Sequence, residues 1–255
     1  MHIDLNCDLG ESYGAFSIGQ DEEIIPYVTS VNIACGFHAG DPSVMAKTIQ
    51  RAQKYGTAIG AHPGYQDLQG FGRRFIPMEK DELFHMLVYQ IGALQGLCLA
   101  YGATLRHVKP HGALYNVAAV QPDIAETIAQ AVRVVNPALI LYGLSGSELV
   151  RAGERAGLKV AHEVFADRSY QRNGTLTPRT EADAIITDKH LAIERVLQFI
   201  NEGTTMSLTG ESIPMKADTV CIHGDHPQAL PFVMDLHERL KREGIMTRSL
   251  ESQHG

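Results

Sequence analysis

Residues 31–55 read VNIACGFHAGDPSVMAKTIQRAQKY, a short apolar run followed by a polar turn and an amphipathic segment. The run Val31–Cys35 is typical of a buried strand. A helix start follows it, because the capping residue Asp41 precedes a proline at the first helical position. The apolar residues of Pro42–Tyr55 then recur at helical spacing. The stretch therefore predicts one strand–turn–helix unit of a parallel sheet.

The same alternation continues along the 255-residue chain and is the pattern of parallel βα units. Seven strands are predicted, over Ile3–Cys7, Val31–Cys35, Ala58–Ala61, His107–Lys109, Leu139–Tyr142, Lys159–Val164 and Thr219–Ile222. Six helices are predicted, over Pro42–Tyr55, Glu79–Tyr101, Pro122–Val135, Ser147–Ala156, Thr187–Glu202 and Gln228–Glu243. Residues 168–178 and 203–217 are predicted as loop or hairpin segments beside the site. We expect an α/β fold in which residues 1–255 form a single seven-stranded parallel (β/α) barrel.

Composition and charge narrow the class of protein. Hydrophobic residues make up 44% of the chain and charged residues 20%, which is typical of a soluble globular protein. The net charge of −7, without a long Lys/Arg run, argues against nucleic acid as a partner. The sequence shows neither an apolar run of roughly 20 residues, which crosses a bilayer, nor the N-terminal pattern of a signal peptide. We expect a cytoplasmic protein without a membrane partner, and reduced thiols at its four scattered cysteines.

Polar residues gather directly after the predicted strands, where a parallel barrel builds its active site. Asp4, Asn6 and Asp8 alternate along the first strand, so all three can face the barrel mouth. Histidines follow four other strands, at His38, His62, His111 and His223. Any one of them alone is more often a turn residue, but four at one rim indicate a functional site.

Structural explanations exist for several of these residues. Asp41 is explained equally well as a helix cap, because it directly precedes a proline. Asp167 and Arg168 can form a structural ion pair. Lys109 is different, because it lies in a strand predicted to be buried, where a charge needs a partner or a task. We therefore assign Lys109 to the site.

Six blocks of the chain, from the first predicted strand to the last, resemble the lactam-utilisation (LamB/YcsF) family, typified by one of the subunits of 5-oxoprolinase. They are Asp4–Glu11 (DLNCDLGE), Asn32–Asp41 (NIACGFHAGD), Gly60–Pro63 (GAHP), His107–Gly112 (HVKPHG), Glu163–Arg168 (EVFADR) and Thr219–Asp225 (TVCIHGD). The resemblance implies a barrel of the glycoside hydrolase/deacetylase type. It also implies that the chain, with two other 5-oxoprolinase subunits, couples ATP hydrolysis to the opening of 5-oxoproline to L-glutamate.

These blocks suit the opening of a lactam, an unactivated amide that must be polarised, attacked by water and protonated at nitrogen. The predicted catalytic residues are Asp8, His38, Lys109, His111 and Asp225. The predicted substrate-binding residues are Asn6, His62, Asp167, Arg168 and His223. Either Asp8 or Asp225 suits the base, while Lys109, Arg168 and histidine donors suit the developing anion.

The Lys-Pro-His-Gly turn after the fourth strand supports the sharpest of these assignments. Pro110 fixes the backbone between Lys109 and His111, so the two side chains should lie side by side and face the cavity. Lys109 would then favour an anion, and the neighbouring imidazole could pass a proton to the lactam nitrogen.

ATP is the implied cofactor, but the chain lacks the G-x-x-x-x-G-K-[ST] loop that commonly cradles its phosphates. Either ATP binds this chain in another way or a partner subunit handles it. Two alternative functions stay open. One is a metal-dependent amide hydrolase or deacetylase in which Asp8, His38 and His62 hold a divalent ion. The other is a lactam-binding protein of the complex without any chemistry of its own.

Overall fold

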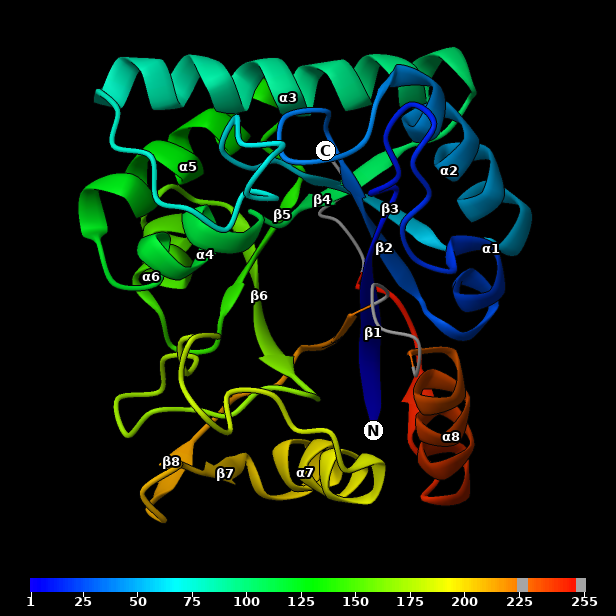
Figure 1. Cartoon of the computed structure of the whole chain (residues 1–255), viewed down its shortest axis with the longest axis vertical. Helices are drawn as coiled ribbons and strands as arrows, with labels where there is room; N and C mark the ends of the chain where they lie inside the picture. Colours follow the sequence, from blue (N-terminus) through cyan, green and yellow to red (C-terminus); the bar gives the residue numbers. More distant parts are fainter. Residues whose placement is uncertain (224–228, 251–255) are drawn as a thin grey trace.

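The computed structural model describes residues 1–223 and 229–250, and its centre is a closed barrel of parallel strands (Figure 1). The barrel strands are β1 (His2–Leu9), β2 (Ser30–Ala34), β3 (Ala58–His62), β4 (Leu105–Val108), β5 (Ile140–Leu144), β6 (Lys159–Phe165) and β9 (Thr219–His223). Each pairs in parallel with the next, and β9 pairs with both β6 and β1, which closes the barrel. The predicted seven-stranded barrel is confirmed.

Helices surround the strands on the outside of the barrel (Figure 1). The six predicted ones are α2 (Pro42–Tyr55), α3 (Lys80–Ala100), α5 (Pro122–Val135), α6 (Glu148–Arg155), α7 (Lys189–Glu202) and α8 (Ala229–Arg242). Asp41 caps α2, because its carboxylate accepts hydrogen bonds from the backbone N–H groups of Ser43 and Val44. The helix-cap explanation of Asp41 is therefore confirmed.

Short elements were not predicted from the sequence. They are α1 (Asp21–Ile24), a 3₁₀ turn at Ile25–Tyr27, α4 (Gly112–Ala118) and β10 (Met246–Thr247), which pairs in parallel with β1. None is long enough to show a hydrophobic period. The segment 203–217 does contain a hairpin, formed by β7 (Thr204–Met206) and β8 (Ser212–Pro214). In addition, β4 ends at Val108, so Lys109 lies just past the strand rather than within it.

The barrel interior is polar and arranged in layers. Alternate residues of β1 point inward. Asp4 lies deepest, where its carboxylate accepts hydrogen bonds from Thr29, Ser30, Tyr142 and Thr219. This set of contacts places Asp4 below the mouth, contrary to the prediction that all three polar residues of β1 face it. The next layer holds Asn6 and Asn32, and the third holds Asp8 at the strand ends.

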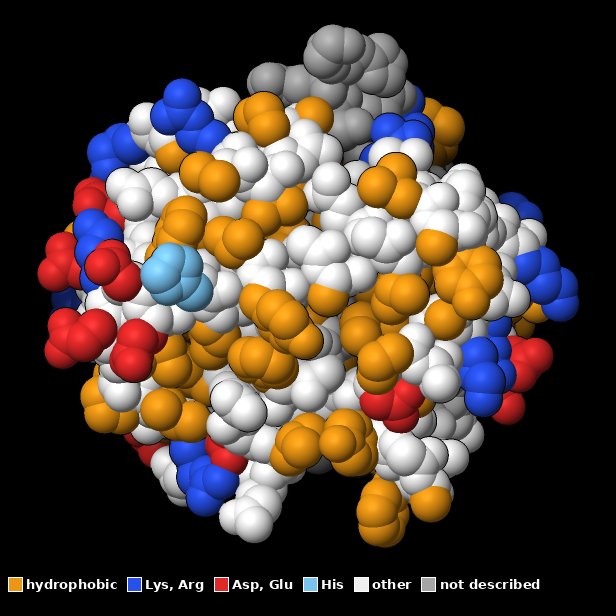
Figure 2. Space-filling model, turned by 90° about the horizontal axis from the view of Figure 1, so that it is seen from above, with side chains coloured by type: hydrophobic (Ala, Val, Ile, Leu, Met, Phe, Trp, Pro, Cys, Tyr) orange, Lys and Arg blue, Asp and Glu red, His pale blue; other side chains and the backbone are white. Residues whose placement is uncertain are grey.

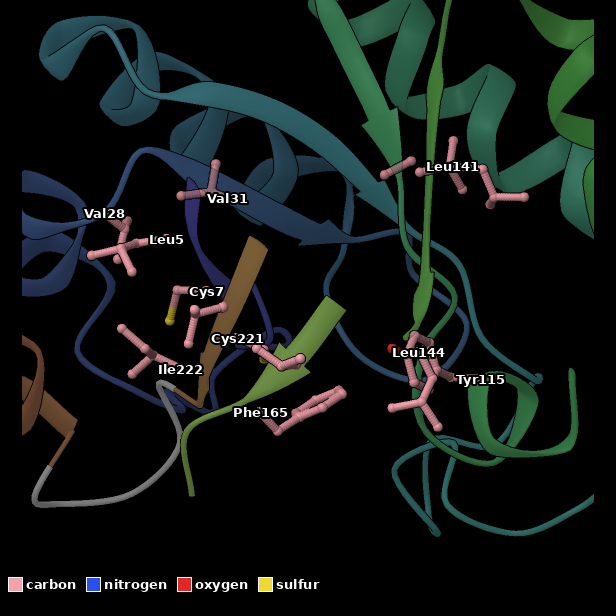
Figure 3. Close-up of a cluster of buried hydrophobic side chains, with 14 of the residues drawn as sticks. Leu5, Cys7, Val28, Val31, Tyr115, Leu141, Leu144, Phe165, Cys221 and Ile222 are labelled. Carbon is pink, nitrogen blue, oxygen red and sulfur yellow. The ribbon is translucent and has the colours of Figure 1, made fainter. Parts of the chain in front are cut away.

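The apolar core lies mainly between the barrel and its helices, and Figure 3 shows part of this cluster, including Leu5, Val31 and Leu141. Of the described residues, only α3 is long and apolar enough to cross a membrane by length and composition. Its Leu83, Leu87, Ile91 and Leu94 are buried in the core, as in a core helix of a barrel. Figure 2 looks onto the α3 side, where hydrophobic side chains spread across the middle and charged ones lie nearer the edges.

Candidate active site

The centre of the strand-end layer is the buried ammonium group of Lys109. Its Nζ atom lies 2.9 Å from Asp8 Oδ1 and 2.9 Å from Glu163 Oε1. It also lies 3.3 Å from Asn6 Oδ1 and 3.1 Å from Cys221 Sγ. The cation is therefore enclosed by groups from β1, β6 and β9, and it is paired with two carboxylates.

Asp8 connects this cation to a cluster of histidines. Its Oδ1 accepts hydrogen bonds from Lys109 Nζ and, at 2.8 Å, from Asn32 Nδ2. Its other oxygen, Oδ2, lies 3.5 Å from Nε2 of His62. Charge-assisted hydrogen bonds of this kind favour the ionised carboxylate. Asp8 also lines the cavity, so it combines a fixed charge with access to a ligand.

Three histidines and one glutamate form the rest of the cluster. His62 Nε2 and His111 Nδ1 are 2.9 Å apart. The ring of His38 stacks on that of His111, with centroids 3.7 Å apart and planes 4° from parallel. Glu11 Oε1 lies 3.6 Å from His38 Nε2 and 3.8 Å from His111 Nδ1. All four residues are buried and bring potential metal-ligand atoms within 4.8 Å of one another.

The backbone around Gly72 explains how the histidines pack so closely. Gly72 has a φ of +63°, and a Cβ there would lie 2.7 Å from His38 Cβ and 2.8 Å from His111 Cδ2. Only glycine fits this position without strain. The preceding carbonyl, of Phe71, lies 2.8 Å from His111 Nε2. The loop therefore both makes room for the two rings and orients one of them.

A cavity of about 420 Å³ opens over this layer. Its polar floor includes Asp8, Glu11, His62, Lys109 and His111. Its walls are apolar and basic, with Phe71, Phe75, Val117, Phe165 and Leu176 beside Arg73, Arg168 and Arg179. The rings of Phe165 and Tyr115, both labelled in Figure 3, meet edge to face at 5.7 Å between centroids. A small anionic ligand with an apolar edge suits this lining.

Burial sets the charges of the site. Burial by itself lowers the pKa of Lys109, but the neighbouring Asp8, Cys221 and Glu163 raise that pKa well above its ordinary value. Burial, reinforced by the other histidines, lowers the pKa of His38 and His111 well below the ordinary value. At neutral pH, Lys109 is therefore a fixed cation, and His38 and His111 favour their neutral forms.

Most of the residues predicted for the site come together. The cluster unites Asn6, Asp8, His38, His62, Lys109 and His111. Lys109 and His111 both line the cavity, as the Lys-Pro-His-Gly turn predicts.

The remaining predicted residues have other positions. Arg168 lines the cavity but is held by the backbone carbonyls of Thr177 and Ala184. Asp167 is not among the lining residues. His223 is placed by its backbone, opposite Asp8 across the β9–β1 pair. Asp225 lies outside the described residues.

Four residues of the site were not predicted, although they lie within the six sequence blocks. They are Glu11, Asn32, Glu163 and Cys221. Alternation along a strand could have found Glu163, because its neighbour Val164 must face the opposite side of β6. The predicted metal set of Asp8, His38 and His62 also differs from the compact group, which has Glu11 and His111 alongside the two predicted histidines.

Comparisons with known proteins cover almost the whole chain. Residues 3–255 match the LamB/YcsF family. The 5-oxoprolinase A chain of Brevibacillus brevis is 55% identical over 243 residues, which are 95% of this chain and 96% of that protein. The protein of the same name from Bacillus subtilis is 55% identical over 253 residues, or 99% and 98% of the two chains.

Solved structures agree with the fold. The crystal structure of a lactam utilization protein from Thermus thermophilus has a TM-score of 0.93 and 43% sequence identity, covering 98% of this chain and 100% of the other. A putative cellobiose-phosphate cleavage protein from Enterococcus faecalis has a TM-score of 0.58 at 13% identity and covers 97% of each chain. The second likeness concerns the fold alone.

Proposed function

The chain belongs to the LamB/YcsF family, and from this premise we propose that it is one subunit of an ATP-dependent 5-oxoprolinase. The reaction cleaves the amide bond of 5-oxo-L-proline to give L-glutamate and hydrolyses ATP to ADP and phosphate. Two partner subunits complete the enzyme. The relatives named as one subunit of 5-oxoprolinase, similar over nearly their full length, support both the activity and the assembly. The cytoplasmic location stays a prediction.

The observation that carries the proposal is the pairing of Lys109 with Asp8 at the floor of the cavity. An unactivated amide needs a base for the attacking water and a positive charge near the oxygen that becomes negative. Asp8 and Lys109 offer the two groups 2.9 Å apart. The basic wall, with Arg73 and Arg179, suits the carboxylate of 5-oxoproline.

Asp8 is the residue that we assign to proton transfer. Its Oδ2 atom takes a proton as water adds to the lactam carbonyl carbon, and returns it to nitrogen as the C–N bond breaks. His62 and His111 are less suited to this step, because each has a ring nitrogen directed at a backbone carbonyl. Lys109 keeps Asp8 ionised and stabilises the negative charge that develops in the cavity.

ATP would supply the activation of the lactam oxygen that an unactivated amide lacks. The sequence has no P-loop motif, so it carries no common cradle for the phosphates of the nucleotide. In our proposal the complex binds ATP, and this chain binds and opens the lactam.

The test of this function is glutamate release from 5-oxoproline by the three purified subunits. We expect release only when ATP, this chain and both partners are all present. Glutamate release at the same rate without ATP, or without this chain, would contradict the proposal.

A metal-dependent amide hydrolase is the second candidate, favoured by the buried group of Glu11, His38, His62 and His111. A divalent ion there would polarise the amide and lower the pKa of a bound water. Activity that needs metal but no ATP would identify this alternative.

A further inference from the structure

The tautomers of His62 and His111 follow from their hydrogen bonds. His62 Nδ1 lies 2.7 Å from the carbonyl oxygen of Lys109, and His111 Nε2 lies 2.8 Å from that of Phe71. A carbonyl oxygen only accepts, so each of these ring nitrogens must carry a hydrogen and donate. In a neutral imidazole the other nitrogen then has a lone pair and no hydrogen.

Those two remaining nitrogens face each other. His62 Nε2 and His111 Nδ1 are 2.9 Å apart, both buried. If both rings are neutral, two lone pairs point into the same small space and repel. The arrangement therefore requires a positive species between them, either a shared proton or a metal ion.

The surroundings favour a divalent ion over a proton. Burial disfavours an imidazolium here, because a buried charge loses its hydration. Two carboxylates approach the same point: Asp8 Oδ2 at 3.5 Å from His62 Nε2, and Glu11 Oε1 at 3.8 Å from His111 Nδ1. Lys109 lies at Asp8 Oδ1, on the other oxygen of that carboxylate, and is shared with Glu163. Carboxylate charge therefore remains to be balanced on the histidine side.

His38 provides an independent sign of a ligand. It is buried, yet neither of its ring nitrogens has a hydrogen-bond partner among the described residues. A buried imidazole without partners is costly. Its Nε2 lies 3.6 Å from Glu11 Oε1, at the edge of the same group.

We propose that a divalent transition-metal ion binds between His62 Nε2 and His111 Nδ1, with Glu11 as its carboxylate ligand and His38 beside it. The backbone carbonyls of Lys109 and Phe71 then have the role that such groups have around metal-ligating histidines, which commonly donate their second ring N–H to a carbonyl. Asp8 becomes a neighbour of the ion, because its Oδ1 is held by Lys109 and Asn32.

Imidazole ligands indicate the class of metal. Two or three histidines with one carboxylate suit Zn²⁺ and its neighbours in the first transition row, whereas Mg²⁺ and Ca²⁺ prefer oxygen ligands. The proposal concerns binding alone and is independent of the reaction. It can therefore fail while the proposed function stands, and the reverse.

The experiment is a calorimetric titration of the chelator-treated full chain with Zn²⁺, without substrate, ATP or partners. We expect one Zn²⁺ per chain. His111→Gln and Glu11→Gln should each weaken Zn²⁺ binding by a factor of about 10 to 100 or more. His190→Gln is the matched control, because His190 is exposed on α7 and should leave binding unchanged.

Co²⁺ absorption in the visible region gives a second measurement, because its spectrum reports nitrogen ligands directly. Circular dichroism confirms that each variant is folded, and Glu11→Gln retains the size of the side chain it replaces. Absence of Zn²⁺ binding in the wild-type chain would overturn the proposal and leave a shared proton between the histidines. Equal Zn²⁺ affinity in the wild type and both site variants would overturn it as well.

Discussion

Lys109 Nζ lies 2.9 Å from Asp8 Oδ1, although the strands that deliver them, β4 and β1, are not neighbours in the barrel. The contact crosses the mouth of the barrel, and Glu163 meets the same ammonium group from β6. A cation enclosed in this way is both a structural tie between strands and a fixed charge beneath the cavity. The two roles lead to separate predictions.

Lys109→Met should destabilise the chain. The substitution leaves Asp8 and Glu163 buried without their cation, and breaking a buried pair in this way typically costs about 3–5 kcal/mol. Urea denaturation measures the free energy of unfolding. The double variant Lys109→Met/Glu163→Gln should regain part of the loss, because it removes one of the uncompensated charges. A double variant less stable than Lys109→Met alone would contradict the pairing.

Asp8→Asn should lower turnover more than substrate affinity. It removes the base but keeps the size of the side chain, and loss of a general base typically costs about 10² to 10⁴ in rate. Steady-state kinetics of the reconstituted complex separate kcat from KM. Asp123→Asn, at an exposed position of α5, is the control. An effect on lactam binding alone would indicate a non-catalytic role for this chain.

Gly60→Ala should destabilise the barrel. A Cβ at residue 60 would lie 2.0 Å from Nε2 of His107, whose ring stacks on Tyr142 and is therefore unable to move freely. Overpacking of a core costs about 1–3 kcal/mol or more. Gly92→Ala is the matched control: it lies in α3 with open space around the new methyl group and should stabilise by up to about 1 kcal/mol. Thermal unfolding of both variants decides; equal melting temperatures would contradict the prediction.

Stability should fall as the pH is lowered below about 6.5. Burial lowers the pKa of His107 to about 3, so the unfolded chain binds a proton there that the folded chain does not. The contribution of this group is fully present above the unfolded pKa of about 6.5 and is lost as the pH falls toward 3, by about 1.4 kcal/mol per pH unit. Denaturation series at several pH values should show a shallower slope for His107→Gln. The same slope in both proteins would exclude His107 as a source of this pH dependence.

The barrel and the rim of its site were predictable from sequence because both depend on local patterns. Strand and helix periods repeat along the chain, and the carboxyl ends of parallel strands share one rim. Positions such as His62, Lys109 and His111 lie at strand ends or directly after them, so their meeting required only the strand order.

The contacts across the barrel were not predictable in the same way. Strand tilt and stagger decide which residues share a layer, and they bring Glu163 to Lys109 while leaving Asp4 below the mouth. The short helix α4 was hidden for another reason. Seven residues starting at Gly112 carry no clear period.

The most direct test of the central claim is the rate of glutamate release from 5-oxoproline by the complete complex carrying Lys109→Met. If Lys109 stabilises charge in the transition state, ATP-dependent release should fall on the order of a hundredfold or more. Circular dichroism and co-purification with the partner subunits must show that the variant is folded and assembled. Near-wild-type, ATP-dependent glutamate release by that complex would contradict the placement of the reaction at this site.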